Sequence, residues 1–244
     1  MVLNLISKFL DLKRLDWKYV VVRTVSNILI LGAIVYATSA FWEVGRQELL
    51  YTYRRLRGVE FTVDTPATDS GTGGDQGGGG SAWSPFAALL AKPTPLKVAP
   101  VSEEFGVIIE KIGVNAPVVE DINMANKAEY LAALEHGVAH AKYTAKPGQV
   151  GNCYLFAHSA LDFWNYGPYG AVFNLLRKLE PGDRVVIFYR GERFDYEVEE
   201  KEVVSGFDVS PLLRTYATPH LTLQTCDPPG VALNRLVVTA KLKQ

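Results

Sequence analysis

Cys226 stands where a thiol could act as a nucleophile. It follows the run Leu-Thr-Leu-Gln-Thr at residues 221–225 and precedes Asp-Pro-Pro-Gly. The run predicts a short strand, and the tetrapeptide ends it, because proline lacks the ladder N–H and glycine favours a turn. Side chains alternate along a strand, so Cys226 faces outward if Leu221 and Leu223 face a core. An outward thiol at a strand end suits nucleophilic chemistry, since free cysteines usually pack inside.

His158 and Arg235 occupy comparable positions on two other predicted strands. His158 ends the apolar run at residues 152–157, and Arg235 begins the last strand of the chain. Alternation places His158 on the face with Tyr154 and Phe156, opposite to Cys153, Leu155 and Ala157. Arg235 lies opposite to the apolar set of its own strand, so both side chains could meet Cys226 on one surface. Cys153 would point into the core instead, which argues against a disulfide between the two cysteines.

The elements that must position these residues are short and rich in β-forming residues. In the second half of the chain, apolar runs alternate with turn signals such as Lys146-Pro-Gly and Glu180-Pro-Gly-Asp. Helical patterns are confined to residues 127–134 and 173–179. Many short strands at this spacing predict a mainly β fold, a closed or nearly closed barrel of about eight strands over residues 101–244.

The N-terminal part carries a different pattern. Residues 1–24 are basic, and residues 25–42 contain no charge. At about 1.5 Å per residue the uncharged segment spans about 27 Å, enough to cross a bilayer, and the helix could extend to about residue 57. The segment starts late and lacks a clean signal-peptide cleavage site, so a retained single-pass anchor is the preferred interpretation. The basic residues before the segment favour a cytoplasmic N-terminus and an extracytoplasmic second half.

Residues 60–100 predict a flexible tether between the anchor and the barrel. They contain the run Gly-Thr-Gly-Gly-Asp-Gln-Gly-Gly-Gly-Gly and then a proline-rich stretch, and both are typical of extended spacers.

The overall composition argues against two other classes of protein. A formal net charge of −1 gives no sign of a nucleic-acid partner. Two cysteines are too few for a scaffold built on disulfides.

Residues 105–244 resemble the sortase transpeptidases. The resemblance rests on Thr-Leu-Gln-Thr-Cys ending at Cys226, on Leu-Phe-Ala-His-Ser around His158, and on the strand Asn-Arg-Leu-Val-Val-Thr-Ala-Lys-Leu that carries Arg235. Further similarity runs through HGVAHAKYTAKPGQVGNCYLFAHS and VFNLLRKLEPGDRV, and an anchor followed by a spacer is the usual layout of the family. The subclass stays unassigned, with the class D and class E sortases nearest.

The sequence departs from the common family pattern at two positions beside His158. Ala157 stands where many relatives have glycine, and Ser159 replaces a common arginine. Neither residue bears a reacting group, but both could alter the groove that holds the substrate.

The resemblance implies a sortase-like closed β-barrel that cleaves an LPxTG-like sorting signal between Thr and Gly. Cys226 would attack the Thr carbonyl as thiolate, His158 would act as general acid and base, and Arg235 would stabilise the oxyanion or hold the substrate. The thioacyl intermediate would pass to an amine, either a cell-wall precursor such as the lipid II cross-bridge or a pilin lysine. The implied partners are surface proteins with C-terminal sorting signals. No metal or organic cofactor is required, and a calcium requirement stays open.

The connection at residues 205–218 precedes the Cys226 strand and in sortases forms a wall of the substrate groove. Five residues are candidates for substrate binding: Thr225, His140, Val209, Leu212 and Leu213. The three apolar candidates could line the groove or form the core of a short helix. The threonine could instead shape its strand, and the histidine could be structural.

Two other functions stay open from the residues alone. A cysteine peptidase outside the cytoplasm would use the same groups and release its product to water. A membrane-tethered β-barrel that only binds a partner would keep its affinity after alkylation of Cys226, whereas a transpeptidase would lose its activity.

Overall fold

The computed structural model describes residues 17–58, 61–63, 96–159 and 169–243. Most of the predicted basic N-terminal segment and most of the predicted tether lie outside the described residues, so the predicted domain boundaries stay predictions. The chain divides into two compact units, Met1–Trp42 and Glu43–Gln244.

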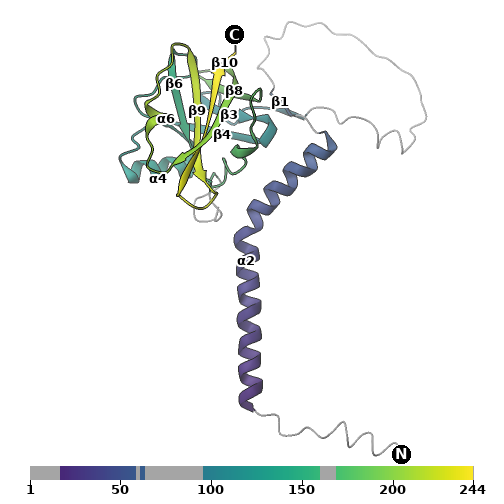
Figure 1. Ribbon diagram of the computed structural model, residues 1–244. Helices are drawn as coiled ribbons and strands as arrows, with labels where there is room; N and C mark the ends of the chain where they lie inside the picture. The colour runs from purple at the N-terminus through teal and green to yellow at the C-terminus, as the bar shows by residue number, and fades with distance from the viewer. Residues whose placement is uncertain (1–16, 59–60, 64–95, 160–168, 244) are drawn as a thin grey trace, which may run out of the picture. The chain divides into compact units, whose positions relative to one another are not determined.

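One long helix, α2 (Trp17–Arg57), carries the apolar N-terminal segment (Figure 1). Its part Trp17–Ser39 is long and apolar enough to cross a membrane, and its apolar stretch is not buried inside the protein. The hydroxyls of Thr38 and Ser39 donate to carbonyl oxygens one turn earlier, which satisfies these polar groups within an apolar helix. This is the helix predicted from residues 25–42, although it begins earlier in the chain.

Eight strands form a closed barrel, which confirms the predicted mainly β fold (Figure 1). They are β3 (Phe105–Ile109), β4 (Val114–Ile122), β5 (Val138–Ala141), β6 (Gly151–Phe156), β7 (Arg184–Tyr189), β8 (Glu192–Ser205), β9 (Pro219–Asp227) and β10 (Asn234–Leu242). Their order around the barrel is β10-β8-β7-β3-β4-β5-β6-β9, and β9 pairs with β10 to close it. The pairs β4–β5 and β6–β9 are parallel, and all others in the barrel are antiparallel.

Two further strands lie at the ends of the segment predicted as a tether. β1 (Phe61–Val63) and β2 (Leu96–Val98) pair in parallel. Val63 is buried in a cluster with Ile108 and Phe188 of the barrel. Both ends of the predicted tether therefore have regular structure, and Val63 and Val98 pack against the barrel surface.

Helix α4 (Lys127–His136) connects the parallel strands β4 and β5, because a parallel pair needs a crossover connection. Asn126 caps its N-terminus, and the side chain accepts a hydrogen bond from the N–H of Glu129. The helix ends at Gly137, where a Cβ atom would come within 2.3 Å of the Pro117 carbonyl oxygen. The other helical pieces are short: η1 (Glu110–Ile112), η2 (Leu176–Lys178) and α6 (Ser210–Leu213).

The strands that carry the candidate site present two different apolar faces. The barrel interior holds, among others, Cys153, Leu155, Leu221, Leu223 and Val238. Along β6, Tyr154 and Phe156 alternate with the interior residues and form a second cluster with Leu134 of α4. The predicted alternation is thus confirmed, and the outer face of β6 is covered by a helix.

Candidate active site

Cys226 and Arg235 lie on β9 and β10, and His158 follows β6; these three strands are neighbours in the barrel (Figure 1). Cys226 and Arg235 face each other in the antiparallel β9–β10 pair, so their side chains leave the sheet on the same face. His158 follows β6, which pairs in parallel with β9. Beyond the end of β6, the N–H of Ala157 donates to the carbonyl oxygen of Gln224 at 3.1 Å. The register therefore continues, and His158 lies level with Cys226.

Two side-chain hydrogen bonds hold the ends of β6 and β9 together. The hydroxyl of Thr225, one residue before the cysteine, donates at 2.9 Å to the carbonyl oxygen of Ala157, one residue before the histidine. The hydroxyl of Ser159 donates to the carbonyl oxygen of Cys226 at 2.6 Å. Both hydroxyl-bearing residues are buried, so neither bond can be replaced readily by water. One bond is donated from β9 to the segment after β6, and the other is donated in the reverse direction. Together they fix the position of His158 along the strands relative to the Cys226 thiol.

The two cysteines have different environments. Cys153 is buried inside the barrel, and this burial raises the pKa of its thiol far above the ordinary range, so it stays an unreactive thiol. Cys226 is partly exposed, and both cysteines are free. Burial also lowers the pKa of the His158 imidazole below its ordinary value of 6.5, so the neutral form prevails at neutral pH and can accept a proton.

Tyr130 of α4 is a site residue that the sequence pattern does not single out. Its ring packs edge-on to His158, with ring centroids 6.4 Å apart and an interplanar angle of 85°, and stacks on Phe156 at 5.3 Å. Burial, and then electrostatic interaction with Cys226, raise the pKa of its hydroxyl, while Arg235 acts in the opposite direction. An aromatic residue in a helical segment is usually a core residue, so no signal in the sequence distinguishes this one.

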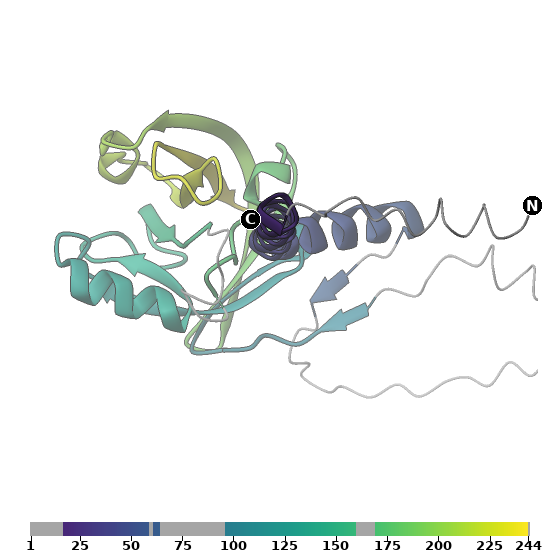
Figure 2. The ribbon, with the colours of Figure 1, turned by 90° about the horizontal axis from the view of Figure 1, so that it is seen from below.

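A groove of about 370 Å³ opens beside Arg235. Residues of α4 and of the connection before β9 form its walls, and α4 and α6 lie on the same side of the barrel in both views (Figures 1 and 2). Val209 and Leu212 line the groove, and Gln224 reaches it from β9. Leu213 is not among the lining residues and is 70% exposed. Of the three apolar candidates, two thus have the position that a substrate-binding role needs.

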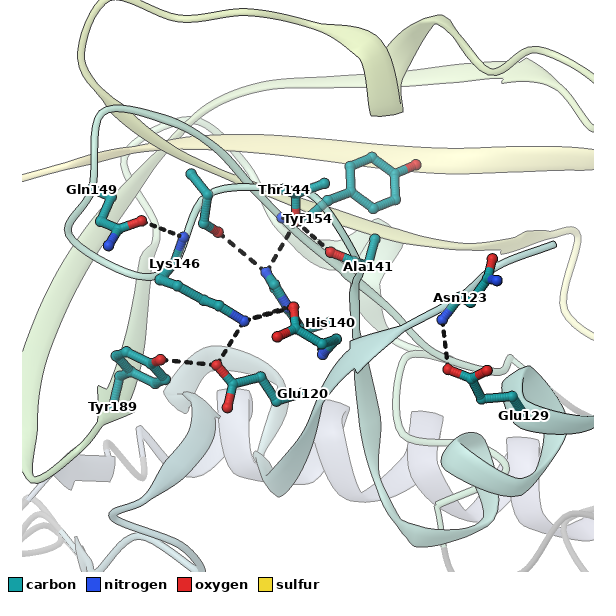
Figure 3. Close-up of polar contacts among 12 residues, drawn as sticks. Glu120, Asn123, Glu129, His140, Ala141, Thr144, Lys146, Gln149, Tyr154 and Tyr189 are labelled. Atoms are coloured by element: carbon teal, nitrogen blue, oxygen red, sulfur yellow. Dashed lines mark hydrogen bonds and ion pairs between the residues drawn. The ribbon is translucent and has the colours of Figure 1, made fainter. Parts of the chain in front are cut away.

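His140 is buried and is not among the residues that line this groove. It belongs to a polar network with partly exposed charged partners (Figure 3). Its Nε2 lies 3.0 Å from the Thr144 hydroxyl and 3.2 Å from the Ala145 carbonyl oxygen. Its Nδ1 accepts a hydrogen bond from the N–H of Asp121 at 3.4 Å, and the Asp121 carboxylate binds the Lys146 ammonium at 2.7 Å. These contacts join the loop after β5 to the end of β4. Within the described ranges, no group of three or more His, Cys, Asp or Glu side chains is arranged to hold a metal ion.

The buried His140 should make the protein sensitive to acid. Burial, and then the positive charge of Lys146, lower the pKa of His140, so the folded state holds this proton less readily than the unfolded chain. The stabilising contribution is present above the ordinary value of 6.5 and is lost as the pH falls through the folded value. We expect the thermal midpoint of the full chain to fall between about pH 7 and about pH 5, and His140→Gln to flatten that slope.

His136→Gln is the matched control for this measurement, because His136 is an exposed histidine on α4. Its slope should equal that of the unmodified chain. Equal slopes for all three proteins would contradict the role given to His140.

Ser159 should act as a positioning residue for His158 and Cys226. Ser159→Ala leaves the Cys226 carbonyl oxygen without its buried partner, which should lower the free energy of unfolding by about 1–3 kcal/mol. We also expect slower alkylation of Cys226 by iodoacetamide, because the His158 imidazole is no longer held beside the thiol. Ser159→Thr keeps the hydroxyl and should restore the rate. Ser102→Ala, which removes a hydroxyl bonded to the Phe105 N–H, is the control for general destabilisation. An alkylation rate that matches the control would leave Ser159 a purely structural role.

A match to a family model agrees with the sequence resemblance. The family model described as "Sortase domain" matches residues 107–243, more than half of the chain. Among solved structures, the chain is similar to a sortase D5 transpeptidase of Clostridium perfringens, with 28% identity and a TM-score of 0.47 over 58% of this chain and 79% of that chain. It is also similar to sortase C-1 of Actinomyces oris, with 26% identity and a TM-score of 0.48 over 59% and 76% of the two chains.

A third similar structure is sortase C of Clostridium perfringens with the C-terminal cell wall sorting motif, at 23% identity and a TM-score of 0.48 over 57% of this chain and 69% of that chain. No curated protein matches the sequence. The family model includes His158, Cys226 and Arg235 together with nearly all of the barrel that brings them to one face. On this match, the chain belongs to the sortase family of cysteine transpeptidases.

Proposed function

We propose that this chain is a membrane-anchored sortase that cleaves an LPxTG-like sorting signal between Thr and Gly and transfers the protein to an amine. The observation that supports this most directly is the meeting of Cys226, His158 and Arg235 on one face, beside a groove. Acyl transfer needs a nucleophile, a group that moves a proton, and donors for an oxyanion, and these three residues are of those kinds.

The first half of the proposed reaction forms a thioester. The Cys226 sulfur attacks the Thr carbonyl carbon, and the neutral imidazole of His158 takes the thiol proton. The N–H donors of Arg235 stabilise the negative charge that develops on the carbonyl oxygen. When the C–N bond to Gly breaks, the imidazolium gives its proton to the departing amine. The lowered pKa of His158 supports this order, because a weakly basic imidazole releases its proton readily.

The second half resolves the thioester with an incoming amine. The amine nitrogen attacks the thioester carbonyl, and His158 removes its proton. The C–S bond breaks, and the Cys226 thiolate that leaves takes the proton back from the imidazolium, which restores the starting state. The acceptor would be a cell-wall precursor such as the lipid II cross-bridge, or a pilin lysine. The surface proteins that carry the sorting signal are the other partner.

The proposed location follows from the long N-terminal helix. Trp17–Ser39 is the candidate single-pass anchor. Lys18 and Arg23 lie at its beginning and favour a cytoplasmic N-terminus, so the barrel would work outside the membrane. Amine acceptors of the cell wall are found on that side.

The Cys226 thiol should be the only site of acyl-enzyme formation. We expect Cys226→Ala to abolish cleavage of LPxTG-like peptides and the covalent adduct seen by mass spectrometry, with the free energy of unfolding changed by no more than about 1–2 kcal/mol. Cys153→Ala is the matched control and should keep the adduct, because that thiol is buried in the barrel.

An adduct that persists in Cys226→Ala would contradict the proposal. Product analysis with and without added triglycine separates transfer from hydrolysis, since a peptidase gives the free acid in both cases. A chain that forms no adduct but keeps a partner after alkylation would be the binding module considered above.

The proposed role of Arg235 in catalysis should require the planar pair of N–H donors of its guanidinium as well as its positive charge. Arg235→Lys keeps the positive charge but loses the planar pair of N–H groups, so we expect kcat/KM to fall by about a hundredfold. Lys241→Arg, on the same strand, is a control for altered cation type at the surface. Kinetics of Arg235→Lys equal to those of the unmodified chain would remove this residue from the mechanism.

A further inference from the structure

The last turns of α2 pack on the barrel through one face of the helix. Gln47, Tyr51 and Arg54 are partly buried, and their spacing of four and then three residues puts them on one side of the helix. Tyr51 packs against the apolar cluster of the barrel interior. The helix end and the barrel belong to the same compact unit, Glu43–Gln244. The end of α2 is therefore part of the folded barrel unit.

Glu48, the neighbour of Gln47, is paired with cations of the barrel. Its carboxylate lies 3.4 Å from the Arg177 guanidinium and 2.9 Å from the Lys178 ammonium. The same ammonium lies 5.5 Å from the centre of the Tyr51 ring, a cation–π contact. These contacts hold the helix end on the barrel and compensate the negative charge of Glu48.

A cavity of about 330 Å³ lies between the helix end and the barrel, and its charged lining is basic. Arg46 and Arg54 line it from α2, and Lys111 lines it from η1. None of the described residues that line it is acidic. The Lys111 ammonium is held by Glu180 and Asp183 at 2.9 and 2.8 Å, so the uncompensated charge of the lining comes mainly from the two guanidiniums. A cavity of this size suits a small ligand.

The Arg54 guanidinium lies over the backbone of Gly113, directly after η1. This glycine has a φ of +69°, and a Cβ atom there would come within 2.7 Å of Nη1 of Arg54. A residue without a side chain thus leaves the space that the guanidinium fills. Arg46 and Arg54 also interact with other groups of the chain. A guanidinium has five N–H donors, so a partner in the protein leaves donors for a ligand.

We propose that this cavity binds the phosphate group of an anionic phospholipid, with Arg46 and Arg54 as the donors. The proposal rests on the proposed membrane anchor and is independent of the proposed reaction. A guanidinium suits phosphate because its paired N–H donors match two phosphate oxygens. Basic pockets between membrane helices take lipid headgroups for the same reason.

The length of the helix favours a lipid over a free anion as the source of the phosphate. Arg46 follows Ser39, the last residue of the apolar segment, by seven residues, so the helix separates the two by at most about 10 Å. The headgroup layer outside the hydrocarbon core is about 5–8 Å thick. Arg46 therefore lies close to the level of the phospholipid phosphates, however the two compact units are oriented. A free phosphate ion has no such enrichment beside the helix.

The test measures thermal unfolding of the full chain in an uncharged maltoside detergent. Separate samples receive dihexanoylphosphatidylglycerol, dihexanoylphosphatidylcholine or inorganic phosphate at equal concentrations. We expect phosphatidylglycerol to raise the thermal midpoint by about 3–6 °C at roughly ten times its dissociation constant. The other two should give less than half of this shift, because choline brings a positive charge into a basic cavity and free phosphate is not concentrated in the micelle.

Arg46→Gln and Arg54→Gln should each weaken the apparent affinity for phosphatidylglycerol by about tenfold to a hundredfold, because each removes a charged pair of donors. Arg55→Gln is the matched control. Arg55 is an exposed residue of the same helix, carries the same charge and does not line the cavity. This variant should keep the affinity of the unmodified chain. If Arg54→Gln is unfolded before lipid is added, Arg46→Gln decides.

An equal loss of affinity in Arg55→Gln and in the cavity variants would assign the binding to general charge and overturn the site. A shift with inorganic phosphate as large as the shift with phosphatidylglycerol would overturn the lipid as the ligand. Failure of the anchor looks different. In that case the full chain does not float with phosphatidylcholine vesicles, and the lipid site falls with the anchor.

Discussion

The relation between imidazole and thiol depends on how the ends of β6 and β9 are held. These strands are parallel and far apart in sequence, since Ser159 and Cys226 are separated by 67 positions. No hairpin turn can set their register, and a slip by one residue would send every side chain to the opposite face. The bonds from Thr225 to Ala157 and from Ser159 to Cys226 oppose such a slip, because each joins a buried hydroxyl to one particular carbonyl. They keep the side chains of His158 and Cys226 on one face.

The alternation of side chains along β6 and β9 gives the two cysteines different environments and therefore different reactivity. Cys153 and Cys226 lie on neighbouring strands, yet one packs inside the barrel and the other reaches the outer face. The same outer face holds Gln224 and Tyr154 among apolar residues, and the Tyr154 hydroxyl donates a hydrogen bond to the Gln224 amide oxygen. Polar groups on that face are thus available for a peptide without weakening the core.

The sequence was sufficient for the strand positions of Cys226, His158 and Arg235, because period-two alternation and Pro-Gly turns are local signals. Contacts between segments that lie far apart in the sequence could not be predicted from local patterns. Ser159 appeared only as a departure from a family pattern, and its bond to the Cys226 carbonyl needs the β6–β9 pairing to be known. Tyr130 belongs to a helix whose apolar residues look alike in sequence.

The positions of two further candidates, His140 and Leu213, also depend on packing that local sequence patterns do not contain. His140 was a candidate for the groove, but the fold of the loop after β5 surrounds it with its own hydrogen-bond partners. Leu213 is a candidate because it lies in the connection that forms a groove wall in sortases, whereas α6 is a single turn and leaves this side chain in solvent. Burial of an isolated apolar residue is decided by packing, which a local pattern does not contain.

The last strand of the barrel ties activity to complete synthesis. β10 covers the edges of both β8 and β9 and also carries Arg235. A polypeptide that stops before residue 234 keeps two open edges and lacks the guanidinium that the proposed reaction requires. Such a truncated product would hold the thiol and the imidazole without the group proposed to bind the oxyanion, so a complete barrel would be a condition of the proposed activity.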